Sequence, residues 1–241
     1  MFIDCHTHIL HGIDDGAKTA EESYEMIDEE IANGAVCIWF TPHFNAKKDS
    51  LERFKAIRNA AYNNIVGKYA EVDITFVNAA EVMLCDELFD LNDINSLCIN
   101  GGENMLVEFG FGSSITDVKR MLGKLIYSYG KTPVIAHIER FKELFYSNKE
   151  ITGLISMGCL LQMSTKILES SILDSLMAFK RIQKNEISLL GTDCHNLTSR
   201  APEFQKALNS LKNVLGSKAV DKLNENAIRI FEDYHEKKLF V

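Results

Sequence analysis

Residues 2–10 read FIDCHTHIL, a short apolar run that ends in two histidines, His6 and His8. A run of this length bounded by polar residues is typical of a buried β-strand. Side chains two positions apart on an extended chain lie on the same face, so both imidazoles point the same way. Imidazole nitrogen binds zinc, iron, manganese and similar ions. The pair indicates the start of a metal site, although an isolated His-x-His fits two unrelated surface histidines equally well.

Beyond this stretch, apolar strand-like runs alternate with amphipathic helices about seven times, which predicts a parallel sheet with crossover helices. The first helix is expected from Thr19 to about residue 33, because Thr19 and Glu22 form a capping-box pattern. A short helix is expected at 84–91, and only helices after Pro202. Seven such units in 241 residues fit a closed α/β barrel better than an open sheet. We therefore expect one domain over residues 1–241.

Composition narrows the class of protein. The formal charge of −8 argues against a nucleic-acid partner, because proteins that bind nucleic acid carry a basic face. The six cysteines form no CxxC pair and lie mostly inside apolar runs, as reduced buried thiols do. We recognise no Cys-x5-Arg phosphate loop and therefore expect no cysteine-nucleophile chemistry. No signal peptide and no apolar run long enough for a membrane span is recognised, which predicts a cytoplasmic protein.

Ligand-type side chains stand at the ends of the expected strands, where barrels carry their chemistry. Five of the seven histidines directly follow a strand, and unrelated core histidines would not sort this way. Glu81 and Glu108 lie at or inside apolar strands, where an unpartnered carboxylate is costly. The candidate metal ligands are His6, His8, Asp15, His43, Glu81, Glu108, His137, Asp193 and His195.

This set is too large for one ion with four to six ligands and suits two or three divalent ions that share carboxylates. Taken singly, its members have simpler explanations: a structural ion pair for either glutamate, a core histidine for His137, a turn residue for Asp15. Asp193-Cys194-His195 is expected to repeat the extended two-apart geometry of the first pair, although D-x-H alone is a weak motif. The joint pattern favours the metal site.

The motifs together resemble the PHP (polymerase and histidinol phosphatase) family of metal-dependent phosphoesterases. Within that family, the chain is similar to the bacterial tyrosine-protein phosphatases of capsule and exopolysaccharide synthesis. The resemblance covers essentially the whole chain, and residues 133–140 are its most diagnostic part. The matching motifs are DCHTHI at 4–9, DDG at 14–16, TPH at 41–43, AE at 80–81, LVEF at 106–109, PVIAHIER at 133–140 and DCHN at 193–196.

The resemblance implies a distorted (β/α)7 TIM-like barrel with two to three divalent ions, most often manganese, with iron or zinc as alternatives. It implies that one ion is held by His6, His8 and Asp193, a second by Glu81 and His137 with Glu108 bridging the two, and a third by Asp15, His43 and His195.

The resemblance also implies that Arg140 and Arg200 grip the substrate phosphate. The predicted catalytic residues are Arg140, Arg200 and His43; the general acid, a metal-coordinated water or a cluster histidine, is left open. The family commonly has Gly-Arg-Pro-Pro where this chain has Ser199-Arg200-Ala201-Pro202, so the loop around Arg200 departs from the pattern. For either arginine, a surface salt bridge is the simpler explanation.

The function implied is hydrolysis of phosphotyrosine on the tail of a bacterial tyrosine kinase that regulates polysaccharide synthesis. Three alternatives stay open on the sequence: a small-molecule phosphatase such as a histidinol phosphatase, a nuclease or polymerase-associated module, and a catalytically inactive binding module. The acidic net charge disfavours the nuclease, and the intact ligand set disfavours the inactive module.

Overall fold

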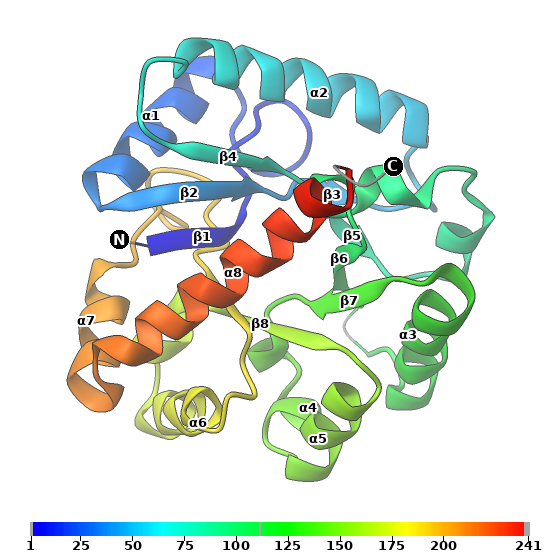
Figure 1. The fold of residues 1–241 in the computed structure, drawn as a ribbon, viewed down its shortest axis with the longest axis vertical. Helices are drawn as coiled ribbons and strands as arrows, with labels where there is room; N and C mark the ends of the chain where they lie inside the picture. Colours follow the sequence, from blue (N-terminus) through cyan, green and yellow to red (C-terminus); the bar gives the residue numbers. More distant parts are fainter. Residues whose placement is uncertain (1, 111, 239–241) are drawn as a thin grey trace.

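Parallel strands alternate with helices along the chain and curl into a ring in the computed structural model (Figure 1). The structure describes residues 2–110 and 112–238, with side chains described up to residue 232. Its strands are β1 Phe2–Thr7, β2 Ala35–Phe40, β3 His43–Phe44, β4 Thr75–Asn78, β5 Glu81–Met83, β6 Asn104–Glu108, β7 Thr132–Ile135, β8 Leu160–Ser164 and β9 Leu189–Gly191.

The segments β2 and β3 form one interrupted strand, and β4 and β5 form another. β2 pairs with β4, and β3, two residues after β2, pairs with β5, two residues after β4. Hydrogen bonding continues across the gap, where the Ala79 amide donates to the Phe40 carbonyl at 2.9 Å and the Glu81 amide to the Thr41 carbonyl at 3.2 Å. Counting each interrupted pair once, the nine described segments occupy seven strand positions.

The ring closes between β1 and β9. Thr7 and Cys194 form a parallel bridge, the His8 amide donates to the Cys194 carbonyl at 2.9 Å, and the Asp193 amide donates to the His6 carbonyl at 2.8 Å. The other neighbours, from β5 through β6, β7 and β8 to β9, pair in sequence order and in parallel. This arrangement confirms the predicted distorted (β/α)7 barrel.

Helices surround the ring, and serine or threonine side chains cap several of them. Thr19 accepts from the Glu22 amide at the start of α1, as its capping pattern predicts, and Gly130 ends α3 with a φ of 61°. The helices are α1 Ala20–Ala32, α2 Leu51–Lys68, α3 Ile115–Tyr129, α4 Lys142–Phe145, α5 Asn148–Ser156, α6 Ile172–Gln183, α7 Gln205–Leu215 and α8 Ser217–Lys238. No helix in the described part of the chain is both long and apolar enough to cross a membrane.

The crossover between β5 and β6 is where the barrel departs most from regularity. The helix expected at 84–91 is a short 3-10 helix, Asp86–Asp90, followed by two more 3-10 turns, Ile94–Leu97 and Ile99–Gly101. A continuous helix does not form here because the Asp93 side chain accepts a hydrogen bond from the Ser96 amide and so caps a new turn.

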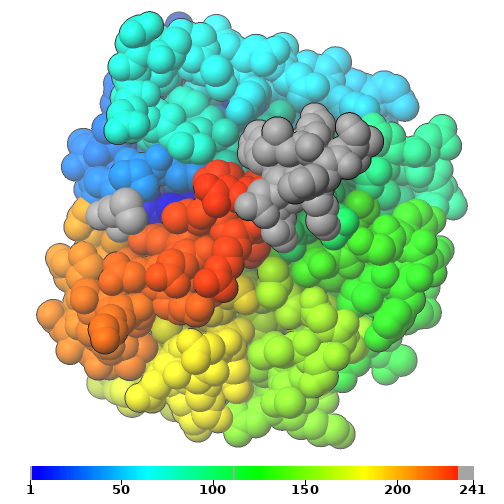
Figure 2. Space-filling view, viewed as in Figure 1, coloured from blue at the N-terminus to red at the C-terminus, as the bar shows by residue number. Residues whose placement is uncertain are grey.

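Two apolar cores hold the barrel together. The larger lies between the strands and the outer helices, and the smaller lines the inside of the ring and packs against Ala227 and neighbours of α8. The Asn224 side chain accepts from the Ile3 amide at 3.1 Å, at the start of β1. In the space-filling view, the orange chain of α7 lies at the left edge and the red chain of α8 extends from there to the centre (Figure 2). Because α8 covers the end where the strands begin, the site lies at the opposite end.

Candidate metal centre

The ends of the strands bring all nine predicted ligands into one cluster. Each histidine of the cluster has a ring nitrogen within 3.4 Å of a carboxylate oxygen of the cluster, and each carboxylate has an oxygen within 3.4 Å of a histidine nitrogen. His6 lies in β1, His43 opens β3, Glu81 opens β5, Glu108 ends β6, and the remaining five, His8, Asp15, His137, Asp193 and His195, come from the loops that follow β1, β7 and β9.

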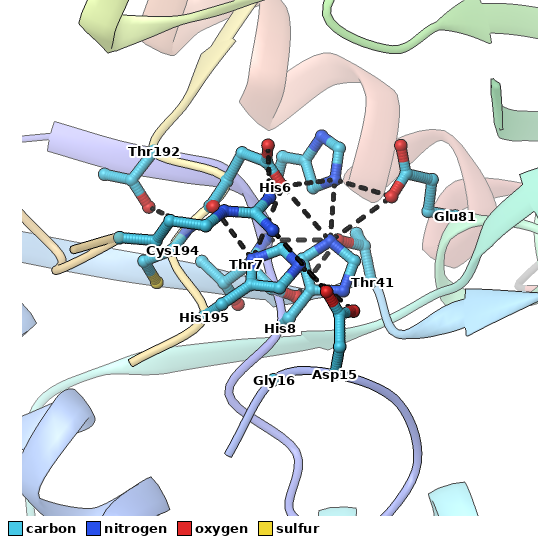
Figure 3. A network of polar contacts seen from close by, with 12 residues as sticks. His6, Thr7, His8, Asp15, Gly16, Thr41, Glu81, Thr192, Cys194 and His195 are labelled. Carbon is cyan, nitrogen blue, oxygen red and sulfur yellow. Dashed lines mark hydrogen bonds and ion pairs between the residues drawn. The ribbon is translucent and has the colours of Figure 1, made fainter. Parts of the chain in front are cut away.

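Glu81 lies at the centre of the cluster and is fully buried. Its Oε2 is 3.1 Å from His6 Nε2, 3.2 Å from His8 Nε2 and 3.0 Å from His43 Nδ1. Its Oε1 is 2.6 Å from His137 Nε2. Burial opposes ionisation of this carboxyl, but the surrounding histidines, His6 foremost, hold the pKa of Glu81 well below its usual range. The imidazoles of His6 and His8 point toward Glu81, while Asp15 approaches from the loop below (Figure 3).

Three groups of atoms within the cluster are compact enough to hold an ion. They are His6, His8, Glu81 and Asp193; His8, Asp15, His43 and His195; and His43, Glu81 and Glu108. His8, Glu81 and His43 each belong to two groups, and of these three the Glu81 carboxylate, with two oxygens, can bridge two adjacent ions. His137 joins through Glu81 and through Glu108 Oε2 at 3.7 Å.

Unsatisfied buried atoms show that these residues suit cations. Buried polar atoms in proteins are nearly always hydrogen-bonded. Among the described residues, His43 Nδ1, Glu81 Oε2, Asp193 Oδ1 and His195 Nε2 are buried without a hydrogen-bond partner, although each faces another member of the cluster.

The spacing of the first two histidines leads to the same conclusion. His6 Nε2 and His8 Nε2 lie 3.1 Å apart. Two ligands at right angles and about 2.1 Å from one ion would be about 3.0 Å apart. The donor set, imidazole and carboxylate without thiolate, suits manganese, iron or zinc.

Two residues outside the predicted set orient the ligands. Asp14 Oδ2 accepts from His8 Nδ1 at 2.7 Å and from the His43 amide at 2.8 Å. Gln162 Oε1 accepts from the His137 amide at 2.7 Å and lies 3.3 Å from His6 Nδ1. Such partners fix the orientation of ligand rings. Both carried a signal in the sequence, since Asp14 belongs to the DDG motif and Gln162 is a lone polar residue in an apolar strand.

The backbone after β9 differs from the expected extended Asp-x-His. Asp193 has a φ of 55° and His137 a φ of 32°, two of the four positive values among described non-glycine residues. Such conformations persist only where the surroundings hold them. The two strand ends also approach closely, because a Cβ at Gly191 would lie 2.6 Å from His6 Cβ. The turn at Asp193, rather than strand alternation, therefore aims the last two ligands.

Arg140 and Arg200 meet at the edge of the cluster on one oxygen of Asp193. Both donate from Nη2 to Asp193 Oδ2, Arg200 at 2.8 Å, while Asp193 Oδ1 lies 3.2 Å from His8 Nε2. Their side chains are 36% and 32% exposed, so both guanidinium groups can reach a ligand from solvent. Despite its altered loop, Arg200 lies at the cluster, because its carbonyl accepts from the His195 amide at 2.8 Å.

The expectation that no Cys-x5-Arg spacing is present is wrong. Cys194 and Arg200 have this spacing, which is typical of cysteine-dependent phosphatases. The structure does not give this cysteine that role. Cys194 is fully buried, its Sγ faces Glu30 Oε1 at 3.9 Å, and burial raises the pKa of its thiol well above the usual value. Figure 3 shows the sulfur on the side away from Glu81.

Comparison with known proteins points to one family. The profile of a family described as "Capsular polysaccharide synthesis, CpsB/CapC" matches residues 2–232. The chain is 31% identical over 233 residues to tyrosine-protein phosphatase YwqE of Bacillus subtilis, covering 93% of this chain and 89% of the relative. It is 27% identical over 248 residues to tyrosine-protein phosphatase CpsB of Streptococcus agalactiae, covering 97% of this chain and 99% of the relative.

A solved structure gives the same result. It comes from work on YwqE of Bacillus subtilis and CpsB of Streptococcus pneumoniae, described as unique metal-dependent tyrosine phosphatases. It superimposes with a TM-score of 0.82 at 25% identity and covers 96% of this chain and 94% of the solved chain. The resemblance to the capsule and exopolysaccharide phosphatases is thus confirmed over nearly the full sequence.

Proposed function

Because the chain belongs to the CpsB/CapC family of capsular polysaccharide synthesis, we propose that it is a metal-dependent protein-tyrosine phosphatase. The observation that carries this proposal is the cluster of nine ligand-type residues with Arg140 and Arg200 at its edge. The cluster offers positions for cations, and the arginines offer donors for the phosphate that the cations would face.

We propose two to three divalent ions, with manganese as the native metal. His6, His8 and Asp193 would hold one; Asp15, His43 and His195 another; and Glu81, Glu108 and His137 a third, with carboxylate oxygens free to be shared between neighbouring ions. When bound, such ions withdraw electrons from phosphoryl oxygens and lower the pKa of water, so that a nucleophile is available near neutral pH.

The protein residues bind and orient the phosphate monoester. Guanidinium presents a planar fork of donors that matches phosphate oxygens, and Arg140 and Arg200 present theirs side by side. We propose a catalytic role for His43 on the substrate side of the cluster, and its exposure of 35%, the highest of the five cluster imidazoles, supports this role. A tyrosine phenol has a pKa of about 10, so it leaves with less need for a protonating group than an alcohol does.

The substrate we propose is a phosphotyrosine-bearing tail of a bacterial tyrosine kinase of polysaccharide assembly, met in the cytoplasm. The relatives named above are tyrosine-protein phosphatases, which supports the kinase as substrate class. We further propose that residues 1–241 act as one domain, because candidate ligands far apart in the sequence, such as His8 and His195, lie in one cluster.

Purified protein tests this function directly. We expect stoichiometric transition metal by elemental analysis and turnover of a phosphotyrosine peptide in preference to histidinol phosphate. Glu81→Gln should lose both metal and activity, because it removes the central carboxylate. Glu150→Gln, which breaks an ion pair with Lys119 away from the site, is the matched control. Preferential turnover of histidinol phosphate, or full turnover by metal-free protein, would overturn the proposal.

A further inference from the structure

A pocket with largely apolar walls adjoins the polar side chains of the metal cluster. It encloses about 410 Å³, within the range of small-ligand pockets, about 300–1,000 Å³. Its walls are largely apolar, formed by Phe109, Ile115, Val118, Phe141 and Leu144, with serines and charged residues beside them. The pocket lies between α3 and the segment that follows β7.

The pocket and the cluster share the same strand ends. Phe109 directly follows the candidate ligand Glu108, and Phe141 directly follows Arg140. The two phenylalanine rings lie 3.9 Å apart between centroids, and Phe141 is 6.2 Å from the His137 ring. Arg140 belongs to both regions, since it lines the pocket and donates to Asp193 in the cluster.

The charges near the pocket do not favour a strongly polar occupant. Two of the three charged residues that line it already have ion-pair partners, since Lys142 is paired with Asp174 at 2.5 Å and Arg140 with Asp193. The apolar walls offer few partners for the hydroxyls of a sugar or polyol, and unpaired polar groups are costly to bury. Phenylalanine rings, in contrast, pack well against another aromatic ring in tilted or offset arrangements.

We propose that this pocket binds the aryl group of the substrate while the phosphate occupies the cluster. A phosphate monoester has an anionic half and an alcohol half, and the structure places an apolar, aromatic-walled pocket beside the candidate metal cluster, with Arg140 between them. The inference rests on the proposed phosphatase function and deepens it, because it assigns selectivity for aromatic monoesters to Phe109, Phe141 and Ile115.

Phosphonates test the pocket without turnover. Calorimetry on the manganese-loaded protein would compare phenylphosphonate, which reaches both regions, with methylphosphonate, which reaches only the cluster. We expect the phenyl compound to bind about tenfold more tightly, the scale of one aromatic contact with its buried area. Phe141→Ala should bring this ratio close to one and leave methylphosphonate affinity unchanged.

Two further variants keep the test decisive. Ile115→Trp, at a partly exposed position, narrows the pocket and should lower the ratio even if Phe141→Ala folds poorly. Phe179→Ala, on α6 and packed against the outer core, is the matched control and should keep the wild-type ratio. An unchanged ratio in the folded pocket variants overturns the aryl pocket. A normal ratio without phosphotyrosine turnover would instead overturn the proposed function alone.

Discussion

Removing the Arg140 guanidinium separates a catalytic role from a structural one. In the structure, Arg140 and Arg200 share Asp193 Oδ2. Arg140→Ala therefore leaves this carboxylate with a cationic partner at 2.8 Å, so Asp193 does not become a buried unpaired charge. The lost pair is also partly exposed, with the Arg140 side chain 36% accessible.

These contacts set the expected magnitudes. A partly exposed ion pair contributes about 0–1 kcal/mol, so the free energy of unfolding should fall by no more than that. Loss of one preorganised donor to a developing oxyanion costs about 10²- to 10³-fold in rate, or about 2.7–4 kcal/mol of transition-state stabilisation. The effect on rate should thus exceed the effect on stability several-fold.

The assay needs three measurements on one preparation: kcat/KM on a phosphotyrosine peptide, metal content by elemental analysis, and melting temperature. Arg120→Ala is the control, because Arg120, on α3 and outside the cluster, forms an exposed pair with Asp86. Arg140→Ala with near-wild-type kcat/KM and full metal content would refute the phosphate-binding role. Loss of metal would show that Arg140 acts through Asp193 on the architecture of the cluster.

Three further predictions follow from the site. Exhaustive chelation should abolish phosphatase activity and Mn²⁺ should restore it; activity that survives complete metal removal, checked by elemental analysis, would contradict the metal centre. Cys194→Ser should retain most activity and full metal content, because the thiol faces Glu30, whereas a hundredfold loss with metal intact would revive a cysteine nucleophile. Asp14→Asn should weaken metal affinity about 10- to 100-fold, measured by competition with a chelator, because Asp14 orients His8; unchanged affinity would remove that role.

Much of the site follows from sequence because parallel strands end at one edge. His6, Glu108 and His137 stand at or just past apolar runs, and the topology then gathers them without long-range information. Barrel closure was likewise foreseeable from the number of alternating units. The two interrupted strands were not foreseeable. The break at Thr41–Pro42 keeps its hydrogen bonds to the neighbouring strand and leaves the pattern of apolar residues unchanged.

What the sequence could not supply is which atoms face each other. Glu81 and Glu108 look equivalent in the sequence, yet Glu81 alone contacts His6, His8, His43 and His137, because it opens β5 inside the ring. The turn at Asp193 also has no local signature, since a positive φ at an aspartate depends on tertiary contacts. The apolar pocket required Phe109 and residues 112–118 to meet residues 140–144 in space.

The closure of the ring between β1 and β9 has a consequence for how the protein matures in the cell. During synthesis, His6 and His8 are made first, and Asp193 and His195 only after most of the chain has been made. Until β9 docks, β1 keeps an unpaired edge, and closing so long a loop carries an entropic cost that slows assembly. If these residues hold ions as proposed, complete metal loading would come at the end of folding, and the bound ions would link β1 to the segment after β9. A nascent chain stalled before residue 193 should bind metal weakly and remain exposed to proteolysis, so metal retention marks a finished molecule.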